Sequence, residues 1–193
     1  MRERARETAR TEILRAAEAC LSELGPDASM ESVAARAGVA VGTLYNHFKS
    51  RDALVETVLR ARYEALDERL RVALAPPGDF TALLERFVAT IFRDFTEHAT
   101  LFALLLHPTR VQPRNAGHGP GVEIMLRHAG FVFDRGVAEC RVTAEAAALQ
   151  RELVVGCIRA ALLWLLVRPF DARAWHEAQR RTLAFVMQGL GAR

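Results

Sequence analysis

Apolar residues recur at spacings of three and four along almost the whole chain, and this spacing constrains the possible folds more than any other feature. It places apolar side chains on one face of an α-helix, whereas a half-buried strand needs strict alternation of apolar and polar residues. Turns of the Asn-Gly type, which would join two alternating runs into a hairpin, do not occur. Hydrophobic residues make up 51% of the 193 positions, which is ample for a buried core. We therefore predict an all-α fold of about nine helices.

Glycine, proline and capping residues mark where these helices begin and end. After a first helix that ends at Gly25-Pro26, helices are expected over 30–37, 41–48, 51–74, 80–95, 101–106, 123–140, 144–167 and 172–190. Ser29 and Ser50 are the expected caps of the second and fourth helices, and Gly38 supplies the positive φ of a tight turn. A surface loop is expected over 108–121, where three prolines and three glycines occur. The short helices would form an N-terminal domain, 1–50, and the longer ones a C-terminal domain, 51–193.

The segment 29–54 carries the most specific pattern in the chain. Ala34 and Ala37 are small where two short helices must cross closely, and Gly38 turns the chain between them. A small core beneath them is expected from Val33, Val39, Leu44 and Phe48. The polar positions of the helix 41–48 are thereby left facing outward. This pattern is typical of a helix-turn-helix, whose second helix enters the major groove of DNA.

The same stretch strongly resembles the DNA-binding region of the tetracycline-repressor (TetR) family, whose recognition segment commonly reads Gly-Val-Ser-x-Gly-Thr-Leu-Tyr-x-His-Phe-x-Ser-Lys-Glu-Ala-Leu. Here residues 38–54 read Gly-Val-Ala-Val-Gly-Thr-Leu-Tyr-Asn-His-Phe-Lys-Ser-Arg-Asp-Ala-Leu. The resemblance covers roughly residues 13–58, and beyond them the chain agrees with the family only in length and helical layout. It implies a cytoplasmic, dimeric transcriptional repressor that binds a palindromic double-stranded operator and is released from it by a small-molecule effector.

Eight residues are expected to contact DNA: Ser29, Val41, Gly42, Thr43, Tyr45, Asn46, His47 and Lys49. An aromatic residue among small and polar ones on a short helix favours contact at Tyr45, although Tyr45 and His47 could also be ordinary surface residues. Lys49 is the only lysine among the 26 basic residues, and the resemblance assigns it to a phosphate. The net charge is only +3, so placement matters more than bulk charge. Residues 36–51 include no acidic residue and could therefore face phosphates unopposed.

The chain departs from the family pattern at two neighbouring positions. Ala40 stands where the family often has a capping serine or threonine, and its methyl group cannot accept a hydrogen bond. This departure should weaken the start of the helix 41–48 by about 1 kcal/mol. Val41 is apolar where a polar residue is frequent, which favours contact with a thymine methyl group there.

The last two expected helices are too apolar on their outer sides to face solvent. One stripe contains Leu149, Leu153, Gly156, Ala160 and Trp164, and the other contains Trp175, Ala178, Thr182, Phe185 and Gly189. By resemblance to the family, these helices pair across a two-fold axis as a four-helix bundle. The expected dimer interface comprises Leu153, Gly156, Ala160, Trp164, Trp175, Ala178, Thr182 and Phe185. The alternative is that both stripes belong to the core of one subunit.

Seven of the ten phenylalanines lie between positions 80 and 133. They could line an apolar cavity or form plain core, and the resemblance favours the cavity. An apolar or aromatic effector is expected to bind among Phe87, Ile91, Phe95, Phe102, Leu105, Met125 and Phe131. Its binding would shift the helix 51–74 and so change the separation of two recognition helices in a dimer.

Other classes of protein fit the sequence less well. An enzyme is not expected, because every serine lies within or near the helix-turn-helix and no His-Glu-x-x-His run occurs. Neither a cofactor nor a metal is expected, and three widely spaced cysteines predict no disulfide framework. The longest apolar run, 153–167, contains Arg159 and is too short for a membrane span. The remaining alternative is a ligand-independent dimeric DNA-binding protein with a solidly packed C-terminal half.

Overall fold

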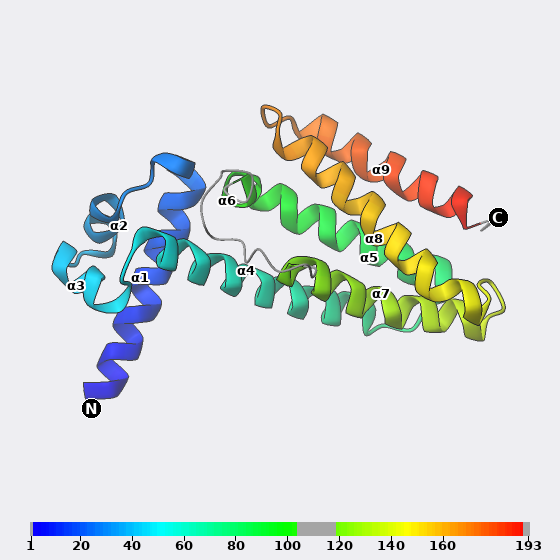
Figure 1. Ribbon diagram of the computed structural model, residues 1–193, viewed down its shortest axis with the longest axis horizontal. Coiled ribbons are helices and arrows are strands. Elements are labelled where there is room, and N and C mark those ends of the chain that lie inside the picture. The colour runs from blue at the N-terminus through cyan, green and yellow to red at the C-terminus, as the bar shows by residue number, and fades with distance from the viewer. Residues whose placement is uncertain (1, 104–118, 191–193) are drawn as a thin grey trace. The chain divides into compact units, whose positions relative to one another are not determined.

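The computed structural model describes residues 2–103 and 119–190, and these residues form nine α-helices and no strand (Figure 1). The helices are α1 (Arg2–Leu24), α2 (Met30–Ala37), α3 (Val41–His47), α4 (Arg51–Leu74), α5 (Phe80–Glu97), α6 (Ala99–Ala103), α7 (Pro120–Ala138), α8 (Ala144–Leu166) and α9 (Ala172–Gly189). A short 3-10 turn, Gly25–Asp27, follows α1. The all-α prediction is confirmed, and no helix within the described ranges is long and apolar enough to cross a membrane.

Several helices begin at capping side chains, and Ser29 and Ser50 act as the caps that the sequence predicts. The side chains of Ser29, Thr143 and Asp171 accept hydrogen bonds from backbone amides in the first turns of α2, α8 and α9. Ser50 Oγ accepts one from Ala53 N at 3.1 Å, at the start of α4. These bonds satisfy amides that have no partner within the helix itself. α7 begins earlier than expected, at Pro120, and proline suits a first helical position because its missing N–H would have no helical partner.

The chain divides into two compact units. The first holds the described residues up to Arg62 together with α6, and the second holds residues 63–97 and the helices from α7 onward. Within the described residues, the chain passes from the first unit to the second inside α4 and returns to the first between α5 and α6. No signal in the sequence marks either point. The expected loop 108–121 and the end of the expected helix 101–106 lie largely outside the described residues.

The core of the first unit lies between α1 and the helices that pack around it. Its fully buried members include Ile13, Ala17, Cys20 and Leu21 of α1, Leu44 of α3, Leu54 of α4 and Phe102 of α6. Leu24 continues the apolar spacing of Ala17, Cys20 and Leu21 but is 46% exposed. It is the last residue of α1, and Ala28 and Met30 of the following segment are buried instead.

The second unit is a layered packing of α5 against α7, α8 and α9, around the phenylalanines of α5. Gly136 of α7 allows a close approach, because a Cβ atom there would lie 2.8 Å from Phe80 Cδ2. The Phe80 ring meets Phe133 edge-on at 5.6 Å, and Phe80 N donates to Glu139 Oε2 at 3.0 Å. Tyr63 packs similarly against Gly121, and burial raises the pKa of Tyr63 to about 12. Gly136 and Gly121 thus allow Phe80 and Tyr63 to pack closely against α7.

Candidate nucleic-acid interface

The turn between α2 and α3 is fixed at both of its ends. At the start of α2, Ser32 N donates to Ser29 Oγ at 3.1 Å and Ser29 N donates to Ser32 Oγ at 3.0 Å. The pKa of the Glu31 carboxyl group is lowered by a hydrogen bond from its own backbone amide and, to a smaller degree, by one from the Ser29 hydroxyl. At the end of α2, Gly38 adopts φ +67°, as predicted, a conformation that disfavours residues with a Cβ atom. The first helix of the pair is therefore held firmly.

α3 begins without side-chain help. Ala40 is its N-cap residue, and no side chain accepts a hydrogen bond from the first turn, as the sequence predicts. The turn is closed by the backbone alone, since Thr43 N and Leu44 N donate to Ala40 O at 2.9 and 3.2 Å. The stability of the first turn of this seven-residue helix therefore depends on how firmly the buried side chains of α3 pack against the rest of the unit.

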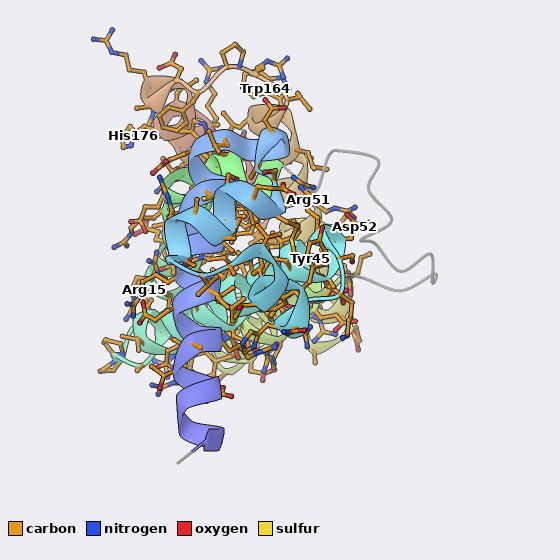
Figure 2. The ribbon with its side chains drawn as sticks, turned by 90° about the vertical axis from the view of Figure 1, so that its left-hand side faces the viewer. Arg15, Tyr45, Arg51, Asp52, Trp164 and His176 are labelled. Carbon is orange, nitrogen blue, oxygen red and sulfur yellow. The ribbon has the colours of Figure 1, made fainter. Side chains whose placement is uncertain are left out.

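Two side chains provide that anchor and leave the outer face free. Leu44 and Phe48 are buried, while Val39, expected beside them, is only half-buried. Gly42, Thr43, Tyr45 and Asn46 are exposed, and Val41 and His47 are half-buried. Figure 2 shows Tyr45 on the face of this unit that is turned toward the viewer, and the side chain is 44% exposed. One short helix thus presents a compact set of small, polar and aromatic groups.

The charges around α3 are less free than the sequence predicts. Arg36 was expected to face phosphates unopposed, but its guanidinium is bound in bidentate fashion by Glu23 of α1. This hydrogen bonding lowers the pKa of Glu23. Arg51 Nε donates to Ala28 O at 2.7 Å. Arg36 thus joins α2 to α1, and Arg51 joins α4 to the segment before α2. The segment 36–51 has no acidic residue of its own, but the charge of Arg36 is already paired with a carboxylate from α1.

Lys49 is the exception in this segment. It follows α3 directly, its side chain is exposed, and no ion pair joins it to another of the described residues. An ammonium group in this position is available to an external anion.

The comparison with known families decides what kind of helix pair this is. The family described as "Bacterial regulatory proteins, tetR family" matches residues 13–58, which run from the buried stripe of α1 into α4. This part of the chain is therefore similar to the DNA-binding region of the TetR family. The match starts and ends at the residues over which the sequence pattern extends.

Relatives and solved structures show the same similarity. The chain is 27% identical over 131 residues to the HTH-type transcriptional regulator UidR of Escherichia coli strain K12, a match that covers 67% of this chain and 63% of UidR. The chain thus matches just under two thirds of that relative's length. It is 34% identical over 84 residues to the HTH-type transcriptional repressor KstR2 of Rhodococcus jostii, covering 43% and 41% of the two chains. The crystal structure of a TetR-family regulator from Mesorhizobium loti covers 96% of both chains with a TM-score of 0.75 at 19% identity, which shows a shared fold. These relatives are named as regulators and not as enzymes.

The residues expected to bind an effector are divided between the two units. Phe87, Ile91, Phe95 and Met125 are all buried in the second unit. Phe102 is buried in the first unit, and Leu105 lies outside the described residues. Phe131 is 54% exposed, so its placement in an interior cavity is wrong. It lies on the side of α7 opposite the buried Ala129, Val132 and Phe133.

The residues expected at the dimer interface divide by helix. On α8, Leu153, Gly156, Ala160 and Trp164 are all exposed, and Leu149 and Leu163 extend the same surface. On α9, Phe185 is exposed and Ala178 is half-buried. Trp175 and Thr182 are buried within their own subunit, so the prediction placed these two residues on the wrong face. Trp175 lies beside Phe170, with their ring centroids 6.2 Å apart.

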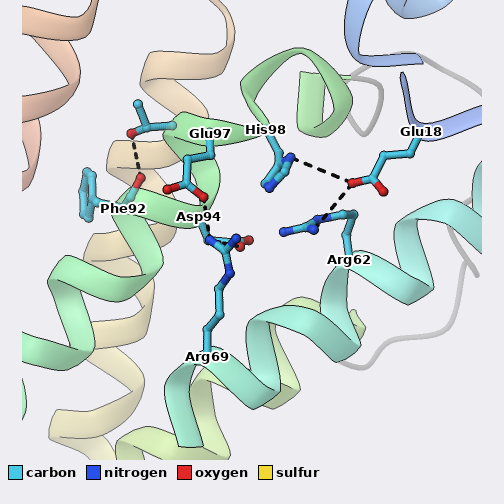
Figure 3. A network of polar contacts seen from close by, with 8 residues as sticks. Glu18, Arg62, Arg69, Phe92, Asp94, Glu97 and His98 are labelled. Carbon is cyan, nitrogen blue, oxygen red and sulfur yellow. Dashed lines mark hydrogen bonds and ion pairs between the residues drawn. The ribbon is translucent and has the colours of Figure 1, made fainter. Parts of the chain in front are cut away.

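Sequence reasoning missed the polar groups that hold α4 in the second unit. Arg69 Nη1 lies 3.1 Å from the fully buried Asp94 and 2.6 Å from Glu97, and hydrogen bonding to Glu97 is the main reason that the pKa of Arg69 is raised (Figure 3). Asp67 Oδ1 meets His128 Nε2 at 2.6 Å and Arg127 at 3.1 Å. An acidic residue on the apolar stripe of α5 was the signal available for Asp94. The described residues hold no cluster of histidine, cysteine and carboxylate groups that would suit a metal.

Proposed function

We propose that this chain is a sequence-specific DNA-binding transcriptional repressor, acting in the cytoplasm as a homodimer on a near-palindromic operator. The observation that carries the proposal is the outer face of α3, which is anchored from below and exposes groups suited to base edges. Its position within the segment that matches the TetR family supports the same assignment. One helix of seven residues reads too few bases alone, so two copies would read two half-sites.

Each exposed group has a role that its chemistry favours. Asn46 can donate to and accept from adenine in a bidentate pair, and Val41 can contact a thymine methyl group. Gly42 and Thr43, at the N-terminal end of α3, allow the backbone to approach the groove closely, while Tyr45 and His47 add contacts along it. Lys49 would bind a phosphate as a point charge. Ser29 would exchange its bond to Glu31 for a phosphate oxygen.

The outer face of α8 supports dimerisation. Leu153 and Trp164 are exposed on it, and a continuous apolar surface of this kind is costly in water unless a partner covers it. Gly156 and Ala160 lie between them and permit close approach of a second helix. Together with Phe185 and Ala178 of α9, these residues would form a four-helix bundle with their copies across a two-fold axis.

Control by a small apolar or aromatic effector is the third part of the proposal. The buried aromatic side chains of α5 and α7 in the second unit would surround such a molecule. α4 belongs to both units, so a shift of its second half would reach the DNA-binding unit along a continuous helix. The ligand can act only through its different affinities for the two arrangements, and operator DNA must weaken its binding to the same degree.

Selection from a random pool of duplexes tests the central claim. The purified chain is mixed with the pool, and bound duplexes are recovered and sequenced over several rounds. We expect two inverted half-sites about one helical turn apart or somewhat more. Enrichment of no sequence, or of a single half-site without symmetry, would contradict the proposed function.

A further inference from the structure

The carboxylate of Glu18, on α1, has two basic neighbours that come from distant parts of the chain (Figure 3). Its Oε1 atom lies 3.5 Å from Arg62 Nη1 of α4 and 4.0 Å from His98 Nδ1, directly before α6. All three residues belong to the first compact unit, which also contains α2 and α3. One carboxylate therefore joins three segments of the unit that carries the recognition helix.

Arg62 and His98 also flank the segment 63–97. The first unit ends along α4 at Arg62 and is resumed after α5 at His98. A displacement of the segment 63–97 that travels along the backbone must reach the first unit through one of these two residues. Glu18 contacts both of them.

The burial of this cluster distinguishes it from an ordinary surface pair. The side chains of Arg62 and His98 are only 12% and 19% exposed, and that of Glu18 is 35% exposed. By contrast, the pair between Glu12 and Arg15 on the same helix is more than half exposed on both sides. Water screens charges in the second pair far more than in the first. Removal of the Glu18 charge would leave a largely buried guanidinium without this counter-charge.

We propose that Glu18 is a positioning residue for operator binding. Its carboxylate fixes the directions in which the chain leaves and re-enters the DNA-binding unit, and in a dimer these directions set the separation of the two α3 helices. The residue does not touch DNA, and it acts through Arg62 and His98. This inference rests on the proposed function.

Two neutral variants on the same helix provide a matched test. Glu18→Gln removes the half-buried charge, and Glu12→Gln makes the same charge change in the exposed pair. Fluorescence anisotropy measures the affinity of each variant for the duplex selected by the wild-type chain and for a scrambled duplex of equal length and composition. Loss of a negative charge should by itself strengthen all DNA binding slightly, so a weakening cannot come from bulk charge.

We expect Glu18→Gln to lose affinity for the selected duplex by about fivefold or more and to keep its affinity for the scrambled one. Glu12→Gln should not weaken either complex. Equal affinities of the two variants for the selected duplex would overturn the inference, and so would a parallel loss on both duplexes, because an unfolded fraction lowers all binding equally.

A second variant covers the case in which Glu18→Gln does not fold, as judged by its circular dichroism. His98→Gln removes only one neighbour of the carboxylate and should show the same selective loss, and unchanged selective binding would overturn the inference. A wild-type chain that selects no duplex would instead refute the proposed function.

Discussion

The outer faces of α3 and α8 are both exposed, and they differ in almost every physical property. α3 is seven residues long and lacks a side-chain cap, and it presents mainly small and polar groups around a single tyrosine. α8 is twenty-three residues long and is capped by Thr143, and it exposes several leucines and Trp164. Neither face is covered by another segment within the described parts of the chain.

This difference indicates the class of partner for each face. An exposed polar face is well solvated, and it gains from a partner only if that partner offers matching hydrogen bonds or charges. An exposed apolar face is costly in water and gains from any well-fitting apolar surface. DNA fits the first description and a second copy of α8 fits the second. Substitutions that exchange the two kinds of chemistry should therefore have very unequal effects.

The largest effect is expected from a charge on the apolar face. Trp164→Asp would place a carboxylate where the proposed dimer excludes water, which should raise the dimer dissociation constant about a hundredfold or more, or about 3 kcal/mol. Analytical ultracentrifugation over a concentration series measures this constant. Phe131→Asp, on α7, is the matched control, because it charges an aromatic residue of similar exposure outside the proposed interface. Equal dimer stability in the two variants would remove α8 from the interface.

Loss of the tyrosine ring on the polar face should have the next largest effect. Tyr45→Ala should weaken binding to the selected duplex at least tenfold, or about 1.4 kcal/mol, with little change for unrelated sequences. Anisotropy titrations give both affinities. Phe131→Ala removes an exposed aromatic side chain from the second unit and should leave both unchanged. If the Tyr45 variant binds the selected duplex as tightly as the wild type, the assigned reading surface is incorrect.

Lys49→Ala should have a smaller and less selective effect. Loss of one phosphate contact in each subunit should weaken binding to all duplexes about fivefold and reduce the slope of log K against log salt by about two for a dimer. Arg173→Ala, which removes an exposed cation at the start of α9, is the control and should leave the slope unaltered. A slope that stays constant in the Lys49 variant would show that this ammonium group does not contact the backbone of DNA.

The smallest effect concerns the uncapped start of α3. Ala40→Ser supplies a hydroxyl that can accept an amide hydrogen bond, and it should raise the free energy of unfolding by about 0.5 kcal/mol. Ala35→Ser, at an exposed position inside α2, offers no such cap and should not stabilise the chain. Urea denaturation followed by circular dichroism compares the two variants. A gain in neither would show that the backbone bonds to Ala40 already satisfy the first turn.

The same two regions show what the sequence can predict. Local signals defined α2 and α3, because Ser29 and Gly38 act on residues only a few positions away. They also identified the buried side of α3, since Leu44 and Phe48 are one helical turn apart. The partner of Arg36 could not be predicted in this way, because Glu23 lies thirteen residues earlier on another helix. Whether these two side chains meet depends on how α1 and α2 cross.

The stripe on α9 shows a second limit. Its five predicted residues span a wide arc, since Trp175 and Phe185 are roughly 80° apart around a helix with 100° per residue. One edge of such an arc can pack inside the subunit while the other faces outward, and Trp175 and Phe185 do so here. Apolar spacing predicts that a helix face is covered. It does not tell whether the same chain or a second copy covers it.

Lys49 has a practical consequence for chemistry on this protein. It is the only lysine in the 193 residues, and its side chain is exposed beside the recognition helix. An acylating reagent would therefore modify a single side-chain amine, at the proposed DNA-facing surface, besides the α-amino group, with no competing lysine elsewhere in the chain. Bound duplex should shield this amine from the reagent, so that the rate of labelling itself reports occupancy of the surface without any substitution.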